Sequence, residues 1–142
     1  MGTVPVKNSK YKKSKTQNNE TFVKKVKSIE DRSKDLFIQV ISLCKLIKIT
    51  PINERIIKQV VASSGSIGAN FQEASCAMSS KDFVKCLKIS RKEAKETSHW
   101  LQGLSVSVDG INEKVDLLVK EANELGYILT SIISNEENKT KF

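Results

Sequence analysis

Residues 83–104 have the sequence FVKCLKISRKEAKETSHWLQGL, and this stretch decides the fold. Apolar or small side chains recur in it at alternating intervals of four and three residues: Phe83, Leu87, Ser90, Ala94, Thr97, Leu101 and Leu104. Such intervals bring side chains to one face of an α-helix. Ser79 precedes the pattern as a candidate N-cap, and Asp109-Gly110 end it. The sequence therefore predicts an amphipathic helix from about residue 80 to residue 108.

Three further stretches show helical periodicity, at residues 33–48, 51–77 and 112–134. Ser33 is the predicted N-cap of the first helix, while Thr50 caps the second and Pro51 begins it. The predicted inward faces are Leu36, Phe37, Val40, Ile41, Cys44 and Ile47, then Ile56, Val60, Ser64, Ile67, Phe71, Ala74 and Met78, then Ile111, Val115, Leu118, Ala122, Leu125, Leu129 and Ile132. Short links force neighbouring helices to run antiparallel. The sequence thus predicts an all-α fold, an antiparallel up-down-up-down four-helix bundle with a disordered basic N-terminal arm.

The middle of the second predicted helix is rich in small residues, with the sequence ASSGSIGA at residues 62–69. Its two glycines lower the helix propensity, and the close approach of a neighbouring helix backbone would offset that cost. We expect the small centres of the second and third helices to face each other. Four residues of this region are interpreted as packing residues: Ser64, Ser66, Asn70 and Glu73. Asn70 falls near the edge of the buried face, where its amide needs partners.

The net charge of +8 is concentrated at the N-terminus. Residues 1–28 contain eight lysines and one glutamate, which give +7, whereas the rest of the chain carries 16 basic and 15 acidic side chains. Few apolar residues offset the entropy of ordering there, so we predict a disordered arm over residues 1–28 and a bundle domain over residues 29–138. A basic arm attracts polyanions, with Lys12, Lys13 and Lys15 as candidate nucleic-acid contacts. The alternative is a solvated tail that only improves solubility.

A second group of lysines follows the helix predicted at residues 80–108. Lys81, Lys85, Lys88, Lys92 and Lys95, here named the lysine row, are spaced by four, three, four and three residues. At ~100° per residue the row lies opposite the buried face. Regularly spaced cations suit a phosphate backbone, and no aromatic residue interleaves them for base stacking. The alternative is an ordinary solvated face, in which Lys92 is spaced to pair with Glu96.

The sequence contains no recognisable catalytic or metal-binding set. Glu96 and His99 have the spacing of half of a di-iron site in a helical bundle, but such a site needs a second motif and the chain has one histidine. Gly65 and Gly68 do not follow a strand, so they are no nucleotide-binding fingerprint. A glutamate such as Glu73, without a nucleophile, metal or histidine beside it, is not a catalytic set. We therefore predict a non-enzymatic protein with no metal and no cofactor.

The cysteines Cys44, Cys76 and Cys86 fall within apolar helical patterns and are interpreted as packing residues. Their odd number and the lack of a C-x-x-C pair indicate reduced thiols in a cytoplasmic protein. No apolar run is long enough to span a membrane, so no membrane partner is predicted. Trp100 lies off the centre of the buried face, where it either fills a groove between helices or anchors an interface between subunits.

Residues 33–134 resemble a bacterial four-helix-bundle family that includes the proteins encoded in intervening sequences of 23S ribosomal RNA genes. The resemblance rests on SGSIGANFQEA at 64–74, SKDF at 80–83, KEAKET at 92–97, WL at 100–101, EL at 124–125 and ILTSII at 128–133. It implies a bundle that assembles into rings, as homopentamers, without an agreed enzymatic activity. The chain is also similar to the accessory proteins of diversity-generating retroelements, which form basic pentameric barrels that contact nucleic acid and a reverse transcriptase. The N-terminal arm departs from the family, as do Val61 and Ala62, where many relatives carry arginines.

The leading interpretation is a non-enzymatic homo-oligomer that binds RNA or DNA through backbone charge. The alternative is a protein-interaction adaptor or scaffold, for example for a reverse transcriptase, without direct nucleic-acid binding.

Overall fold

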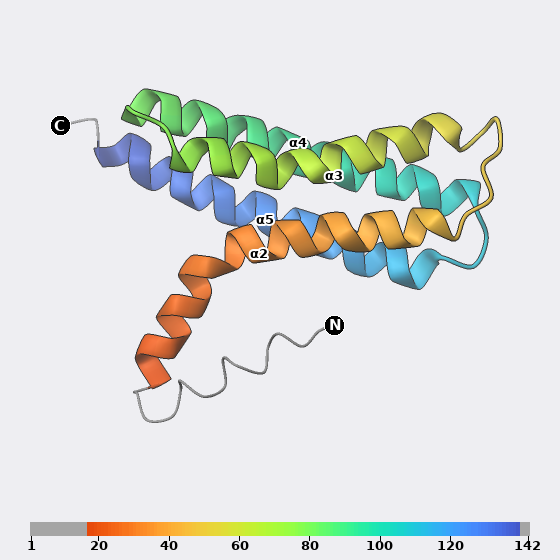
Figure 1. Cartoon of the computed structure of the whole chain (residues 1–142), viewed down its shortest axis with the longest axis horizontal. Coiled ribbons are helices and arrows are strands. Elements are labelled where there is room, and N and C mark those ends of the chain that lie inside the picture. Colours follow the sequence, from red (N-terminus) through yellow and green to blue (C-terminus); the bar gives the residue numbers. More distant parts are fainter. Residues whose placement is uncertain (1–16, 140–142) are drawn as a thin grey trace.

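The computed structural model describes the backbone of residues 17–139 and the side chains of residues 29–139. This part of the chain forms the helices α2 (Gln17–Lys45), α3 (Glu54–Ser75), α4 (Ser80–Ser107) and α5 (Asn112–Lys139), without a strand among residues 17–139. The helices run antiparallel along the chain, with α3 beside α4 and α2 beside α5 (Figure 1). The predicted all-α, up-down-up-down four-helix bundle is therefore confirmed.

The core lies where the predicted faces meet. Leu87, Leu101 and Leu104 of α4 are completely inaccessible to solvent, as predicted from the spacing of residues 83–104. The larger apolar cluster unites all four helices and is made of Leu36, Val40, Leu43, Val60, Ile67, Ala94, Leu101, Leu104, Val115, Leu118, Ala122 and Leu125. Burial of such side chains is the main favourable contribution to folding.

A second apolar cluster lies at the end of the bundle where α4 begins and α5 ends, and its members among the side chains that the structure describes come from three helices. It joins Ala74 of α3, Leu87 of α4, and Leu129 and Ile133 of α5. Phe83 packs against this cluster. The first turns of α2 point away from the other helices at this end (Figure 1). Within residues 29–139, the apolar cluster at this end is therefore formed by α3, α4 and α5.

The start of α2 differs from the prediction. The helix begins at Gln17, so residues 17–28 are its first turns, whereas residues 1–16 of the predicted arm lie outside the described part of the chain. The apolar spacing Phe22, Val26 and Ile29 continues the helical pattern toward the N-terminus. Ser33 consequently lies inside the helix and caps nothing: its buried hydroxyl donates to the carbonyl oxygen of Glu30 at 3.1 Å.

The start of α3 also differs, because Asn53 rather than Thr50 occupies the N-cap position. The Asn53 side chain is buried and holds the preceding link: its Oδ1 accepts from the Thr50 amide at 2.8 Å, and its Nδ2 donates to the Lys48 carbonyl oxygen at 3.1 Å. At the other end, α3 stops at Ser75. Met78 was predicted to face inward but lies in the following link, with 94% of its surface exposed.

Small residues let α3 approach two neighbours on different faces. Towards α4, Thr97 Oγ1 donates to Ser63 Oγ at 2.9 Å and Ser90 Oγ donates to the Ile67 carbonyl oxygen at 2.7 Å, all buried. The expected contact between the small centres of the second and third predicted helices is confirmed.

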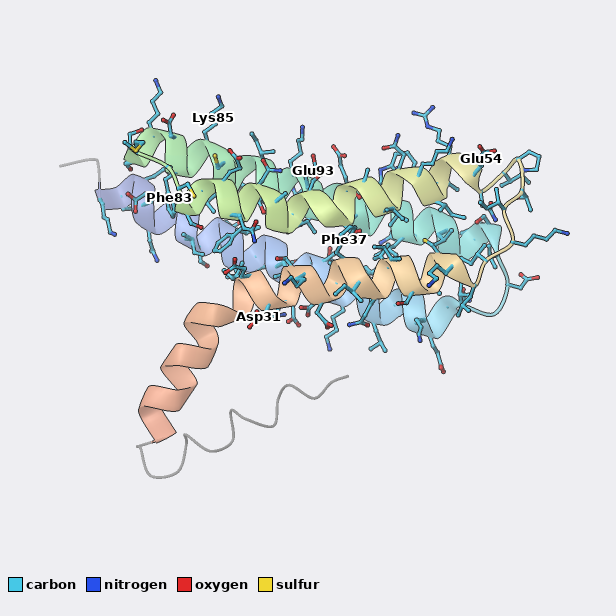
Figure 2. The ribbon with its side chains drawn as sticks, viewed as in Figure 1. Asp31, Phe37, Glu54, Phe83, Lys85 and Glu93 are labelled. Atoms are coloured by element: carbon cyan, nitrogen blue, oxygen red, sulfur yellow. The ribbon has the colours of Figure 1, made fainter. Side chains whose placement is uncertain are left out.

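The two glycines of α3 face α2 instead. A Cβ atom on Gly65 would lie 2.9 Å from Phe37 Cε1, and a Cβ atom on Gly68 would lie 2.9 Å from Ser33 Oγ. Phe37 occupies the space between α2 and α3 (Figure 2). The glycines thus accommodate side chains of α2, whereas the sequence had suggested the approach of a backbone.

Candidate functional site

All five residues of the lysine row are exposed on α4, on the side opposite the buried face. Lys85 projects away from the bundle into solvent (Figure 2). Because Lys81 and Lys95 are fourteen positions apart on one helix, the row extends over about 21 Å. The structure thus gathers these predicted site residues on one accessible face.

An open groove of about 1150 Å³ runs along this face. Its lining comes from α4 and the last turns of α5: Ser80, Lys81, Asp82, Val84, Lys85, Lys88, Ile89, Lys92 and Glu137. Four members of the lysine row therefore line one groove, while Lys95 lies beyond it. Val84 and Ile89 are half-buried and give the groove an apolar portion.

Two carboxylates of α5 contact residues that line this groove, and that of Glu137 lines it as well. Lys88 Nζ lies 3.1 Å from Glu137 Oε2, and both side chains are about half exposed. Ser80 Oγ donates to Glu136 Oε2 at 2.8 Å, and Lys139 Nζ lies 3.5 Å from Glu136 Oε1. An ion pair as exposed as that of Lys88 with Glu137 is worth about 1 kcal/mol or less, because water screens it.

The middle of α4 is electrostatically mixed. No ion pair joins Lys92 to Glu96 in the described part of the chain, although their spacing allows one. Glu93 is half-buried beside them: its burial raises the pKa of its carboxyl above the ordinary value, the nearby Glu96 raises it further, and Lys92 opposes the shift. The lysine row is thus flanked by acids at both of its ends.

The other predicted nucleic-acid contacts, Lys12, Lys13 and Lys15, lie outside the described residues. The structure therefore gives no spatial relation between them and the lysine row.

The predicted packing residues of α3 have different environments. Ser64 is fully buried and its hydroxyl donates to the Val61 carbonyl oxygen at 3.2 Å. Ser66 Oγ donates to Ala62 within the same helix at 2.9 Å, and Asn70 Nδ2 donates to the Ser66 carbonyl oxygen at 2.8 Å.

Asn70 therefore satisfies its amide within α3 and does not join two helices, and Glu73 is exposed. The buried hydrogen bonds between α3 and α4 come instead from Ser63, Ser90 and Thr97. The sequence analysis placed Ser90 and Thr97 on the buried face only as small residues. Their hydroxyl groups at core positions could have predicted these hydrogen bonds, because a buried hydroxyl needs a partner.

Trp100 is half-buried and packs against the larger apolar cluster. Its ring meets that of His99 edge to face, with centroids 5.1 Å apart. The indole thus covers one side of the larger apolar cluster. That Trp100 also contacts another subunit stays a prediction.

Residues 29–139 contain no group of three His, Cys, Asp or Glu side chains arranged to hold a metal ion. Glu96 and His99 are both exposed on α4. Among the cysteines, Cys44 is half-buried and burial raises the pKa of its thiol, whereas Cys76 is exposed at the end of α3. The described helices include none that is long and apolar enough to cross a membrane.

The fold and this face together define the class of the protein as an antiparallel four-helix bundle with a row of exposed lysines on α4. The family model of the 23S rRNA-intervening sequence proteins matches residues 25–131, and the chain belongs to this family. The chain is also similar to a protein of unknown function from the S23 ribosomal protein family of Bacteroides thetaiotaomicron, solved by crystallography. The two share 33% sequence identity and a TM-score of 0.65, over 74% of this chain and 97% of the other. No curated protein sequence matches the chain.

Proposed function

We propose that this protein binds RNA or DNA through the phosphate backbone, as a homo-oligomer and without catalysing a reaction. The observation that carries the proposal is the lysine row, five exposed ammonium groups along about 21 Å of one helix, four of them on one groove. Lysines that neutralise phosphates release condensed counterions, which makes such binding favourable and strongly dependent on salt.

Recognition at this face reads charge rather than base sequence. Phe83 is the one aromatic residue between Lys81 and Lys95, and it packs against the second apolar cluster. No aromatic platform in that stretch is therefore available for stacked bases. A lysine ammonium is a compact charge that contacts phosphates without reading the neighbouring base.

Assembly would strengthen binding, because once one subunit's lysine row holds the nucleic acid, the rows of the other subunits are at a high effective concentration. Large apolar side chains on the α2 and α5 surface support such contacts between subunits, because Ile38, Leu117 and Tyr127 are more than half exposed. These residues belong to helices other than the one that carries the lysine row. Subunits that met through them would leave α4 accessible.

The experiment is a salt titration of the full-length protein against labelled RNA and DNA of mixed sequence, followed by fluorescence anisotropy. Replacing the five lysines of the row with glutamine should weaken binding at least about tenfold near physiological salt and flatten the salt slope, which is about 0.7 to 0.9 per phosphate contact. The name of the family contains 23S rRNA, and that of the Bacteroides relative's family contains the words ribosomal protein. A fragment of 23S rRNA should therefore be one of the RNAs tested in this titration.

The matched control replaces five exposed lysines outside the row with glutamine: Lys34, Lys45, Lys48, Lys114 and Lys120. It removes the same charge but leaves the α4 face intact, so it should retain most of the affinity. A third variant, Lys12, Lys13 and Lys15 to glutamine, measures the contribution of the N-terminal segment. Equal affinity of the wild type and the row variant at every salt concentration would refute the proposal.

A second candidate function is a protein-interaction adaptor. Leu46, Ile49 and Ile52 expose most of their surface in and beside the link between α2 and α3, and Val106 is 87% exposed near the end of α4. Exposed aliphatic side chains of this kind favour a protein partner, and the resemblance suggests a reverse transcriptase. Association with such an enzyme that survives nuclease treatment and is lost in Leu46→Ser/Ile49→Ser would favour this function.

A further inference from the structure

The last two turns of α5 place two consecutive carboxylates against the N-terminal end of the lysine row. Glu136 accepts from the Ser80 hydroxyl at 2.8 Å, and Glu137 lies 3.1 Å from the Lys88 ammonium. Glu137 also lines the same groove as four of the row lysines. The acidic end of α5 is therefore part of the candidate binding face.

Both carboxylates occupy positions that would also suit a phosphate. Ser80 belongs to the first turn of α4, where the helix dipole and the free backbone amides favour a negative charge. Carboxylates and phosphates accept hydrogen bonds from the same ammonium and hydroxyl donors. A polyanion lying along the groove would compete with Glu136 for Ser80 and with Glu137 for Lys88.

We propose that Glu136 and Glu137 are built-in competitors of the nucleic-acid backbone, which must displace them to engage the N-terminal half of the lysine row. The inference rests on the proposed function and adds a regulation of that same site. The Lys88–Glu137 contact is weak enough to be displaced, since both side chains are about half exposed, and Glu136 is held to Ser80 by one hydrogen bond to a neutral hydroxyl. The carboxylates thus lower the affinity and do not close the site.

The test compares Glu136→Gln/Glu137→Gln with wild type, using a labelled single-stranded RNA of mixed sequence and fluorescence anisotropy at physiological salt. Glutamine keeps the length and an acceptor oxygen for Ser80, so the helix contact persists without the charge. Removing the two negative charges that compete with phosphates should tighten binding by about threefold to tenfold. Thermal unfolding of each full-length variant confirms that the fold is retained.

The matched control is Glu113→Gln/Asp116→Asn, which removes two exposed carboxylates from the opposite end of α5. It changes the net charge by the same amount, so any gain from overall charge alone would appear in both variants. We expect the control to bind within about twofold of wild type, because water and salt screen charges far from the groove.

A double-mutant cycle adds a local readout. Lys88→Gln should weaken binding little in the wild type, where Glu137 already neutralises Lys88, and more in the Glu137→Gln background. Equal effects in both backgrounds, or equal tightening in the control, would overturn the inference while leaving the proposed function standing. Binding that does not respond to loss of the lysine row would instead refute the proposed function, and the inference with it.

Discussion

Arg32 of α2 holds Glu121 of α5 through two parallel hydrogen bonds, from Nε to Oε2 at 2.7 Å and from Nη2 to Oε1 at 2.8 Å. The same Nη2 donates to Glu124 Oε1 at 2.8 Å. These carboxylates raise the pKa of the Arg32 guanidinium, with the Glu121 hydrogen bond as the largest cause. Within the part of the chain that the structure describes, α2 and α5 form the least extensive of the four helix pairings, and this ion pair joins the two helices.

Replacing Arg32 with alanine should therefore lower the free energy of unfolding by about 1 kcal/mol, because two-pronged arginine–carboxylate pairs exceed ordinary surface pairs. Urea unfolding followed by circular dichroism measures the change. Lys58→Ala is the control, since its pair with Glu54 at 3.3 Å is far more exposed. A loss no larger in Arg32→Ala than in Lys58→Ala would contradict the assigned role.

Glu93 predicts a pH dependence with a definite sign. Its pKa is raised by burial, so the folded protein binds the proton more tightly than the unfolded chain does. This group's contribution to stability is therefore lost as the pH rises from the ordinary glutamate pKa through the raised one. Glu93→Gln should be more stable than wild type at neutral pH, and the difference should vanish below about pH 3.5. Unfolding of wild type and Glu93→Gln, measured in parallel across this pH range, checks the prediction, and a stability difference that does not change with pH would contradict it.

The buried hydrogen bond between Thr97 and Ser63 should show non-additive energetics. Thr97→Val removes one hydroxyl and leaves Ser63 with only a long bond of 3.4 Å to the Val60 carbonyl oxygen, at a cost of about 1–2 kcal/mol. Thr97→Val/Ser63→Ala removes both hydroxyls and should cost less than the sum of the single changes. Strict additivity in urea unfolding would show that the two side chains are not coupled.

Glycine-to-alanine changes should separate a packed glycine from a free one. Gly126→Ala should stabilise α5 by about 0.5–1 kcal/mol, since a Cβ there meets nothing within 4 Å and alanine is the better helix former. Gly68→Ala should give no such gain, because its Cβ would lie 2.9 Å from Ser33 Oγ. Ser33→Ala in the Gly68→Ala background removes that oxygen and should restore the gain. Melting temperatures of these three variants, of Ser33→Ala alone and of wild type test the prediction, and equal gains at both glycines would contradict the close contact.

The spacing of residues within a helix correctly predicted, for most of its side chains, which are buried and which are exposed. The intervals between Leu87 and Leu104 gave the buried face of α4, and those between Lys81 and Lys95 gave its exposed face, because both depend only on the helical repeat. Ser79 was correctly predicted as the cap of α4, where its hydroxyl accepts from the Asp82 amide at 3.1 Å.

Contacts between distant segments could not be predicted in this way. Glu136 reaches Ser80 across 56 positions, and this meeting depends on how the ends of α4 and α5 align in space. The wrong cap at Ser33 has a related cause: a serine before an apolar repeat has the same sequence appearance whether the helix starts there or continues through it. The structure distinguishes these two possibilities, because α2 continues through Ser33 and the Ser33 hydroxyl donates to the Glu30 carbonyl oxygen.

The three-helix composition of the second apolar cluster has a mechanical consequence for the groove. Leu87, Leu129 and Ile133 lie beneath the wall that carries Lys85, Lys88 and Glu137, and none of the members of that cluster described among residues 29–139 belongs to α2. We therefore expect substitutions in α2 to alter the shape of the groove less directly than substitutions in α4 or α5.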